Sequence, residues 1–230
     1  MRTVLFWDFD GTLAEAPHIW SNTLYRLLLK TVPDCDVTLA DIRRYTARIF
    51  PWDSPDKDHV AAKDAGWWRC MERRFFMMYQ ELGIGEEAAR MASRGVRPCL
   101  TDPGNYRLYP DALDTLSRCR IMGYASYILS NNFPELEELS HALGISAYVD
   151  GFAVSACIGY EKPRPEIFEY AKKLAGEAER YVMIGDNPAA DIDGGRTAGM
   201  RTILVHKDVP CRADRVCKTL AQIPEVLVSL

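Results

Sequence analysis

Near its start the chain carries a stretch that decides its fold: Thr3-Val4-Leu5-Phe6-Trp7-Asp8-Phe9-Asp10-Gly11-Thr12. The run up to Trp7 is continuous, largely apolar and rich in β-branched and aromatic residues, which is typical of a strand buried on both faces of a parallel sheet. Asp8 and Asp10 then lie at its C-terminal end. Because open parallel sheets bind ligands outside the carboxyl ends of their strands, this stretch predicts both the sheet and the place of a site.

Similar apolar runs recur later in the chain, at residues 124–129, 151–154, 181–184 and 201–205. Helix-like stretches separate them, and this alternation predicts an α/β fold with a doubly wound parallel sheet. The last residues, 220–230, are expected to form a short closing helix and a strand edge.

The segment between the first two runs, residues 15–105, shows helical periodicity and no convincing strand. Helices are predicted at residues 19–31, 39–50, 60–81 and 86–95. Thr38 and Asp41 fit an N-terminal capping box with Asp in place of the usual Glu or Gln, and Pro51 and Pro55 break the chain after the second helix. We therefore predict an α/β core of residues 1–14 and 106–230, with a helical cap of residues 15–105 inserted into it.

The composition narrows the class of protein. The chain has 230 residues, 48% of them hydrophobic, and a net charge of −4 without a basic stripe, so we expect no nucleic-acid partner. Its seven cysteines are scattered and form no C-x-x-C pair, which indicates reduced thiols. No signal peptide and no run of about 18 apolar residues is visible. We expect a soluble cytoplasmic protein that binds no membrane.

The two aspartates after the first run, Asp8 and Asp10, are candidates for nucleophilic and acid–base catalysis. An ionised carboxylate such as that of Asp8 can attack phosphorus and hold the phosphoryl group, which splits one hard displacement into two easier ones. Asp10, on the same side of an extended segment, can give a proton to the leaving oxygen and later take one from water. Carboxylates that face a phosphate need compensating positive charge, and Mg²⁺, a hard cation with oxygen ligands, is the expected cofactor.

Three further motifs follow at later strand ends, and with the first they resemble, in order, the four motifs of the haloacid dehalogenase superfamily over most of the chain outside the insert. They are the serine of Ile128-Leu129-Ser130-Asn131, the lysine of Gly159-Tyr160-Glu161-Lys162-Pro163, and the acidic run from Gly185-Asp186 to Asp191. Any one of them is weak evidence, but four in order at strand ends are specific.

The resemblance implies a role for each matching residue. Asp8 is the nucleophile, Asp10 the acid and base, and Lys162 and Ser130 hold the phosphoryl oxygens. The implied metal ligands are the Asp8 and Asp186 side chains and the Asp10 carbonyl, with Asp191 acting through water or by positioning its neighbours. Candidate substrate-binding residues from the same motifs are Phe9, Thr12 and Asn131.

The resemblance also separates the possible reactions. Dehalogenases of the superfamily lack the second aspartate of the first motif, so Asp10 favours phosphoryl transfer, and the position of the insert resembles a type 1 helical cap. We predict a Mg²⁺-dependent phosphatase that hydrolyses a small phosphorylated metabolite through an aspartyl phosphate, as a monomer or homodimer. A β-phosphoglucomutase-like phosphotransferase is the alternative, and a non-catalytic phosphate-sensing module is less favoured.

Several of these residues also have plain structural interpretations. Residues 130–132 can cap a helix at 135–143, and Asp191 can brace the glycine-rich turn that follows it. The insert's tryptophans, at positions 20, 52, 67 and 68, are mostly expected in its core, and His18 and His59 at its surface or in packing. Arg164 can reach the cap, an anionic substrate or solvent.

Overall fold

The computed structural model describes residues 2–15, 18–54 and 56–230, so Pro55 lies outside the described residues. Its centre is a six-stranded parallel sheet in the order β5-β4-β1-β6-β7-β8. The strands are β1 (Thr3–Trp7), β4 (Ala125–Ser130), β5 (Phe152–Val154), β6 (Arg180–Gly185), β7 (Arg201–Val205) and β8 (Arg215–Cys217). Since β1 pairs with both β4 and β6, the carboxyl ends of these three strands lie side by side.

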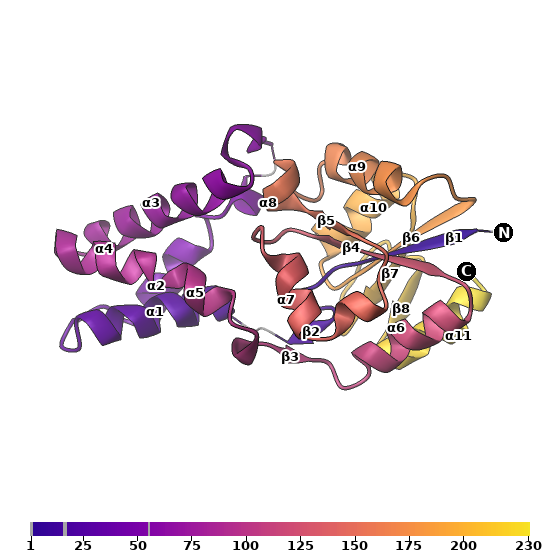
Figure 1. Ribbon diagram of the computed structural model, residues 1–230, viewed down its shortest axis with the longest axis horizontal. Coiled ribbons are helices and arrows are strands. Elements are labelled where there is room, and N and C mark those ends of the chain that lie inside the picture. Colours follow the sequence, from indigo (N-terminus) through magenta and orange to yellow (C-terminus); the bar gives the residue numbers. More distant parts are fainter. Residues whose placement is uncertain (1, 16–17, 55) are drawn as a thin grey trace.

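The two faces of β1 pack against different helices, as a doubly wound sheet requires. Leu5 and Trp7 belong to the apolar cluster that includes α6 (Ala112–Ile121), α7 (Leu136–Ala142) and α11 (Ile223–Val228). Val4 and Phe6 belong to the cluster formed with α9 (Pro165–Ala175). Figure 1 shows these helices on opposite sides of the sheet. The predicted doubly wound α/β fold is confirmed.

Short helical segments complete this part of the molecule. They are η4 (Ile145–Ala147), α8 (Ser155–Ile158), the π-helix η5 (Pro188–Asp193), α10 (Gly194–Thr197) and η6 (Leu220–Gln222). Both α8 and η5 directly follow sheet strands, β5 and β6, and so they help to form the rim of the sheet at its carboxyl edge.

The helices of the predicted cap form a separate lobe beside the sheet (Figure 1). They are α1 (Ile19–Thr31), α2 (Leu39–Thr46), η1 (Pro51–Asp53), η2 (Val60–Ala62), α3 (Ala65–Glu81), α4 (Glu86–Arg94), α5 (Val96–Leu100) and η3 (Pro103–Asn105). A two-stranded antiparallel ladder, β2 (Ala14–Glu15) with β3 (Arg107–Leu108), lies where the chain leaves and re-enters the core. This ladder sits beside the predicted domain boundaries, and the expectation of no strand from residue 15 onward was wrong at Glu15.

Two predicted cap helices are shorter than expected. The helix expected at residues 39–50 ends at Thr46, although its capping box of Thr38 and Asp41 is present. Beyond it the Ile49 carbonyl accepts a hydrogen bond of 2.5 Å from Arg74 of α3, and the Phe50 N–H donates to the Asp53 carboxylate. The side chains of Arg74 and Asp53 therefore form hydrogen bonds with backbone groups that a longer helix would pair within itself.

The helix expected at residues 60–81 is interrupted at Asp64, whose φ of 54° is left-handed. There the chain is tied to the core, because the His59 N–H donates to the Gly159 carbonyl at 2.7 Å and the Asp64 N–H to the Ala156 carbonyl at 2.8 Å. These hydrogen bonds to the core replace bonds within a helix. A tertiary contact therefore interrupts the helix that periodicity alone predicts to be continuous.

Other sequence expectations were also corrected. Helix α7 begins after Glu135 without a side-chain cap, so residues 130–132 do not cap it. The edge strand is β8, which precedes residues 220–230 rather than lying within them. All seven cysteines are free. Among the described residues, no helix has both the length and the apolar composition needed to cross a bilayer.

Candidate functional site

A cavity of about 530 Å³ opens at the carboxyl edge of the sheet, between the core and the cap helices. Five side chains predicted for the site line it together: Asp8, Asp10, Ser130, Lys162 and Asp186. Asn131 lines it as well. The parallel arrangement explains the meeting, because β1, β4 and β6 place the aspartates, Ser130 and Asn131 at their adjacent ends, and Lys162 comes from the loop between α8 and α9.

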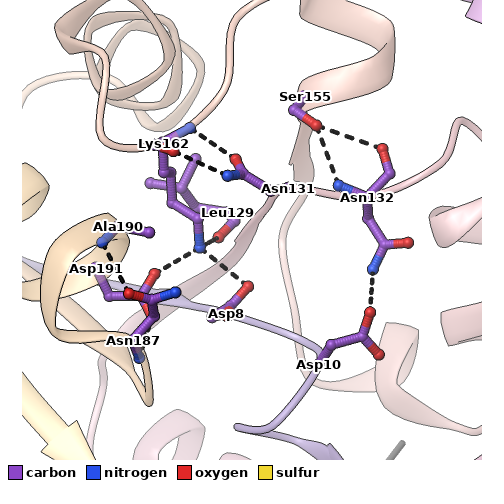
Figure 2. A network of polar contacts seen from close by, with 10 residues as sticks. All are labelled: Asp8, Asp10, Leu129, Asn131, Asn132, Ser155, Lys162, Asn187, Ala190 and Asp191. Carbon is purple, nitrogen blue, oxygen red and sulfur yellow. Dashed lines mark hydrogen bonds and ion pairs between the residues drawn. The ribbon is translucent and has the colours of Figure 1, made fainter. Parts of the chain in front are cut away.

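Lys162 is the centre of the polar network in Figure 2, and only 2% of it is exposed. Its Nζ lies 3.0 Å from Asp8 Oδ1 and 2.6 Å from Asp191 Oδ1, and it donates to the Leu129 carbonyl at 2.8 Å. Burial by itself would lower the pKa of Lys162, but the charges of Asp191 and Asp8 outweigh it and raise that pKa. The ammonium therefore stays charged beside the predicted nucleophile at neutral pH.

Asn131 holds the loop that carries this lysine. Its side-chain amide donates to the Lys162 carbonyl at 2.9 Å, and its Oδ1 accepts from the Lys162 N–H at 2.7 Å. This two-way contact fixes the end of β4 to the loop before α9, two segments that are 31 residues apart. Asn131 thus positions Lys162 as well as facing the cavity.

Asp10 lies on the other side of the cavity floor, where Asn132 donates to its Oδ2 at 3.0 Å (Figure 2). Its Oδ1 is buried and has no partner among the described residues. Burial and the neighbouring charge of Asp8 raise the pKa of Asp10 to about 7, against the lowering effect of Asn132. A carboxyl group with this pKa can hold and release a proton near neutral pH, as an acid and base must.

Asp8, Asp186 and Asp191 form a group of carboxylates whose oxygens lie within 4.8 Å of one another. Hard oxygen donors at this spacing suit a hard divalent cation. Asp191, however, is fully buried and already accepts from Lys162 and, at 2.9 Å, from the Asn187 N–H. Asp8 and Asp186 are the members that line the cavity, so the donor set fits a cation held mainly by these two.

Gly11 makes room for this arrangement. Its φ is +80°, and a Cβ added there would lie 2.7 Å from Asp186 Oδ2. A glycine is therefore required both by the turn after β1 and by the approach of the Asp186 carboxylate.

Two residues predicted to bind substrate are not brought to the cavity as side chains. Phe9 is fully buried and packs near Tyr106, with 5.9 Å between ring centroids. Thr12 is also fully buried, and its carbonyl contacts His206 Nε2 at 3.0 Å. Both residues come after Asp8 in the sequence, but their side chains point into the hydrophobic interior, because the chain turns back at Gly11. Of these two, only backbone groups are left to meet a substrate.

The structure adds roles that the sequence did not assign. Lys207 lies after β7 and its Nζ is 2.7 Å from Asp186 Oδ2, while burial and the charge of Asp8 raise the pKa of Asp186. Asn132 supports Asp10, and Asn187 caps η5 by accepting from the N–H groups of residues 189 and 190. The roles of Lys207 and Asn132 carry no local signal, because their partners come from other segments. Asn187 before Pro188 is a local signal for a helix N-cap.

The cap supplies the opposite wall of the cavity. Trp20 of α1 and Trp52 of η1 line it together with His18 and Asp53, whereas Trp67 and Trp68 are buried in the cap. The expectation that the tryptophans are mostly core is thus half right. Arg164 reaches the cap, since its Nη1 donates to the Asp56 carbonyl at 3.1 Å.

Comparison with known proteins agrees with this geometry. A family model described as haloacid dehalogenase-like hydrolase matches residues 2–199. A glyceraldehyde 3-phosphate phosphatase from Methanothermobacter thermautotrophicus is 36% identical over 218 residues, which are 91% of this chain and 88% of that protein. A phosphoserine phosphatase from Thermus thermophilus is 33% identical over 138 residues, 59% of this chain and 54% of that protein. The chain spans about half the length of this and some other curated relatives.

Solved structures give the same fold. The hydrolase YfnB from Bacillus subtilis, whose crystal structure contains magnesium, superposes with a TM-score of 0.71 over 98% of both chains, at 22% sequence identity. At this identity the likeness concerns the fold alone.

Proposed function

The chain belongs to the haloacid dehalogenase-like hydrolase family, and we propose that it is a Mg²⁺-dependent phosphatase that hydrolyses small phosphomonoesters. The observation that carries the proposal is the pairing of Asp8 with Lys162 at 3.0 Å, with Asp10 lining the same cavity at a pKa of about 7. A nucleophile, a fixed positive charge and a proton donor then face one site.

In the first step Asp8 attacks phosphorus, the bond between phosphorus and the leaving oxygen breaks, and Asp10 gives that oxygen its proton. In the second step water attacks the aspartyl phosphate, Asp10 takes a proton from the water, and the bond to Asp8 breaks. Lys162 balances the negative charge of the phosphoryl oxygens and stays in place because Asp191 and the Leu129 carbonyl hold its ammonium.

The remaining contacts to the phosphoryl group come from the sheet edge. Ser130 is 1% exposed and lines the cavity, so its hydroxyl is suited to accept or donate one hydrogen bond there. We assign Asn131 to positioning and the backbone N–H of Phe9 to phosphoryl binding, with Thr12 in a structural role.

A magnesium ion, held by the Asp8 and Asp186 side chains and the Asp10 carbonyl, would supply the positive charge that lets an anionic nucleophile approach a phosphate. We place Asp191 outside direct contact with the ion, because it is committed to Lys162 and to the Asn187 N–H.

The substrates of the relatives support a small metabolite. The Methanothermobacter relative is named for glyceraldehyde 3-phosphate and the Thermus relative for phosphoserine, both small phosphomonoesters. We propose a small cytoplasmic phosphorylated metabolite as the substrate of this chain, acted on by a monomer or homodimer. Hydrolysis is favoured over a phosphoglucomutase-like transfer because two curated relatives that are more than 30% identical over about nine tenths of the chain are named as phosphatases.

The test is p-nitrophenyl phosphate turnover with Mg²⁺ and with EDTA, in the wild type and in Asp8→Asn. We expect turnover that requires Mg²⁺ and falls by at least about 10³-fold in the variant, because covalent catalysis is lost. Asp193→Asn is the matched control, since Asp193 is an aspartate two residues beyond the last motif that pairs with Arg212 at 2.9 Å on the surface. Full turnover in Asp8→Asn would refute the mechanism, and product analysis for free phosphate against an isomerised sugar phosphate separates hydrolysis from transfer.

A further inference from the structure

The charges around the cavity are unevenly distributed. Among the described lining residues Lys162 is the only lysine or arginine, and Asp8 and Asp191 hold it at the phosphoryl end. The cap end presents one carboxylate, Asp53, and one imidazole, His18. A leaving group that carries a carboxylate or a second phosphate would therefore meet Asp53, with no lysine or arginine on the described cap wall of the cavity to pair with it.

The carboxylate of Asp53 is held in place. Its Oδ2 accepts from the Phe50 N–H at 2.9 Å, which leaves Oδ1 available to accept a hydrogen bond from a ligand. A leaving group with hydroxyl, amino or imide N–H groups can supply such a donor, and a carboxylate cannot.

The rest of the cap end is flat and aromatic. Trp52 lines the cavity and stacks on Phe50, with ring centroids 4.7 Å apart and planes 10° apart. Trp20 lines it too and lies 6.1 Å from Trp67 and 6.3 Å from Phe75, both of which are buried. Because buried rings support both indoles from behind, the wall is fixed before a ligand arrives and favours a flat apolar group.

From these observations we propose that the cap end of the cavity selects phosphomonoesters with an uncharged, flat leaving group, of the nucleoside type, and excludes anionic leaving groups through Asp53. The inference rests on the proposed phosphatase function and specifies the substrate class for the same site. On the core side the cavity adds Pro163, Ala189 and Ala190, which offer an anionic group no charge to pair with.

Three probes separate charge from shape. Glyceraldehyde 3-phosphate and 3-phosphoglycerate share a carbon skeleton and differ in an aldehyde against a carboxylate, and uridine 5′-monophosphate adds a flat base. We expect kcat/KM to be highest for the uridine ester. It should be at least about tenfold higher for the aldehyde than for the carboxylate, because the carboxylate would be repelled by Asp53 and has no lysine or arginine on the described cap wall to pair with.

Substitutions at Asp53 and Trp52 test whether these residues cause the expected substrate preferences. Asp53→Asn should narrow the aldehyde-to-carboxylate ratio and Asp53→Lys should reverse it, whereas Trp52→Ala should lower kcat/KM for the uridine ester more than for the aldehyde. Asp58→Asn is the control on the same segment, because Asp58, like Asp53, is exposed but does not line the cavity. Thermal melting identifies any variant that fails to fold, and Asp53→Asn keeps an oxygen acceptor for the Phe50 N–H.

The outcomes distinguish this inference from the proposed function. A wild type that prefers 3-phosphoglycerate, or folded Asp53 variants with an unchanged ratio, would overturn the substrate class while Asp8-dependent turnover of p-nitrophenyl phosphate leaves the phosphatase intact. A wild type without turnover of any of these esters would overturn both.

Discussion

Gly159 lies where the core loop before Lys162 meets the cap, and replacing it by alanine tests that contact. Its φ is +91°, and a Cβ there would lie 2.6 Å from the Val60 Cα and 2.8 Å from the Val60 N. Both atoms are backbone, so no rotamer change can relieve the clash. The Gly159 carbonyl also accepts the His59 N–H at 2.7 Å, which places the clash inside the contact between cap and core.

The size of the effect can be worked out with a matched control. Gly123 has a φ of +87° and nothing within 4 Å of its added Cβ, so Gly123→Ala carries only the strain of a left-handed alanine, about 1 kcal/mol. Gly159→Ala carries the same strain plus overpacking, typically about 1–3 kcal/mol. For a chain of this size each kcal/mol lowers Tm by about 2–4 °C, so Gly159→Ala should melt roughly 2–12 °C below Gly123→Ala.

The assay is thermal unfolding followed by circular dichroism, with kcat/KM for p-nitrophenyl phosphate measured in parallel. Displacement of the segment around Val60 should also disturb Trp52 and Asp53, so we expect activity to fall in Gly159→Ala and to persist in Gly123→Ala. Equal melting temperatures and equal activities in the two variants would refute the reasoning that this contact fixes the cap segment against the core.

Two further predictions concern buried and paired charges. Burial raises the pKa of Glu161 from 4.5 to about 7, so this group stabilises the fold fully below pH 4.5 and loses that contribution as the pH rises to about 7. Glu161→Gln should therefore be more stable than the wild type at pH 8 by about 3 kcal/mol and nearly equal to it at pH 4.5, and urea unfolding curves with the same difference at both pH values would contradict this. Lys207→Met should tighten Mg²⁺ binding up to about fivefold in calorimetry, since the half-exposed Lys207 competes for Asp186 at 2.7 Å. Arg212→Met, which breaks the surface pair with Asp193, is its control, and an unchanged or weaker affinity in Lys207→Met would exclude the competition.

The sequence alone was enough for the α/β fold, the helical insert and the meeting of Asp8, Ser130, Lys162 and Asp186 at one cavity. The reason is geometric. The carboxyl ends of neighbouring parallel strands share an edge, so residues that follow buried apolar runs converge once the strand order is set. The capping box of Thr38 was equally readable, because its contacts lie within four residues.

Only the tertiary structure decided how those groups are partnered. The amide that donates to Asp10 comes from Asn132, which is 122 positions away, and the lysine that pairs with Asp186 is Lys207, in the segment after β7. The helix predicted at residues 60–81 is interrupted at Asp64, because the Asp64 N–H donates to the Ala156 carbonyl of the core. Helical periodicity and local propensity report what neighbouring residues prefer. They carry no information about how deeply the fold buries a group or which distant donor, acceptor or charge it places beside that group. Burial and those neighbours together set the pKa of Asp10, and the neighbours set the charge of the cavity wall.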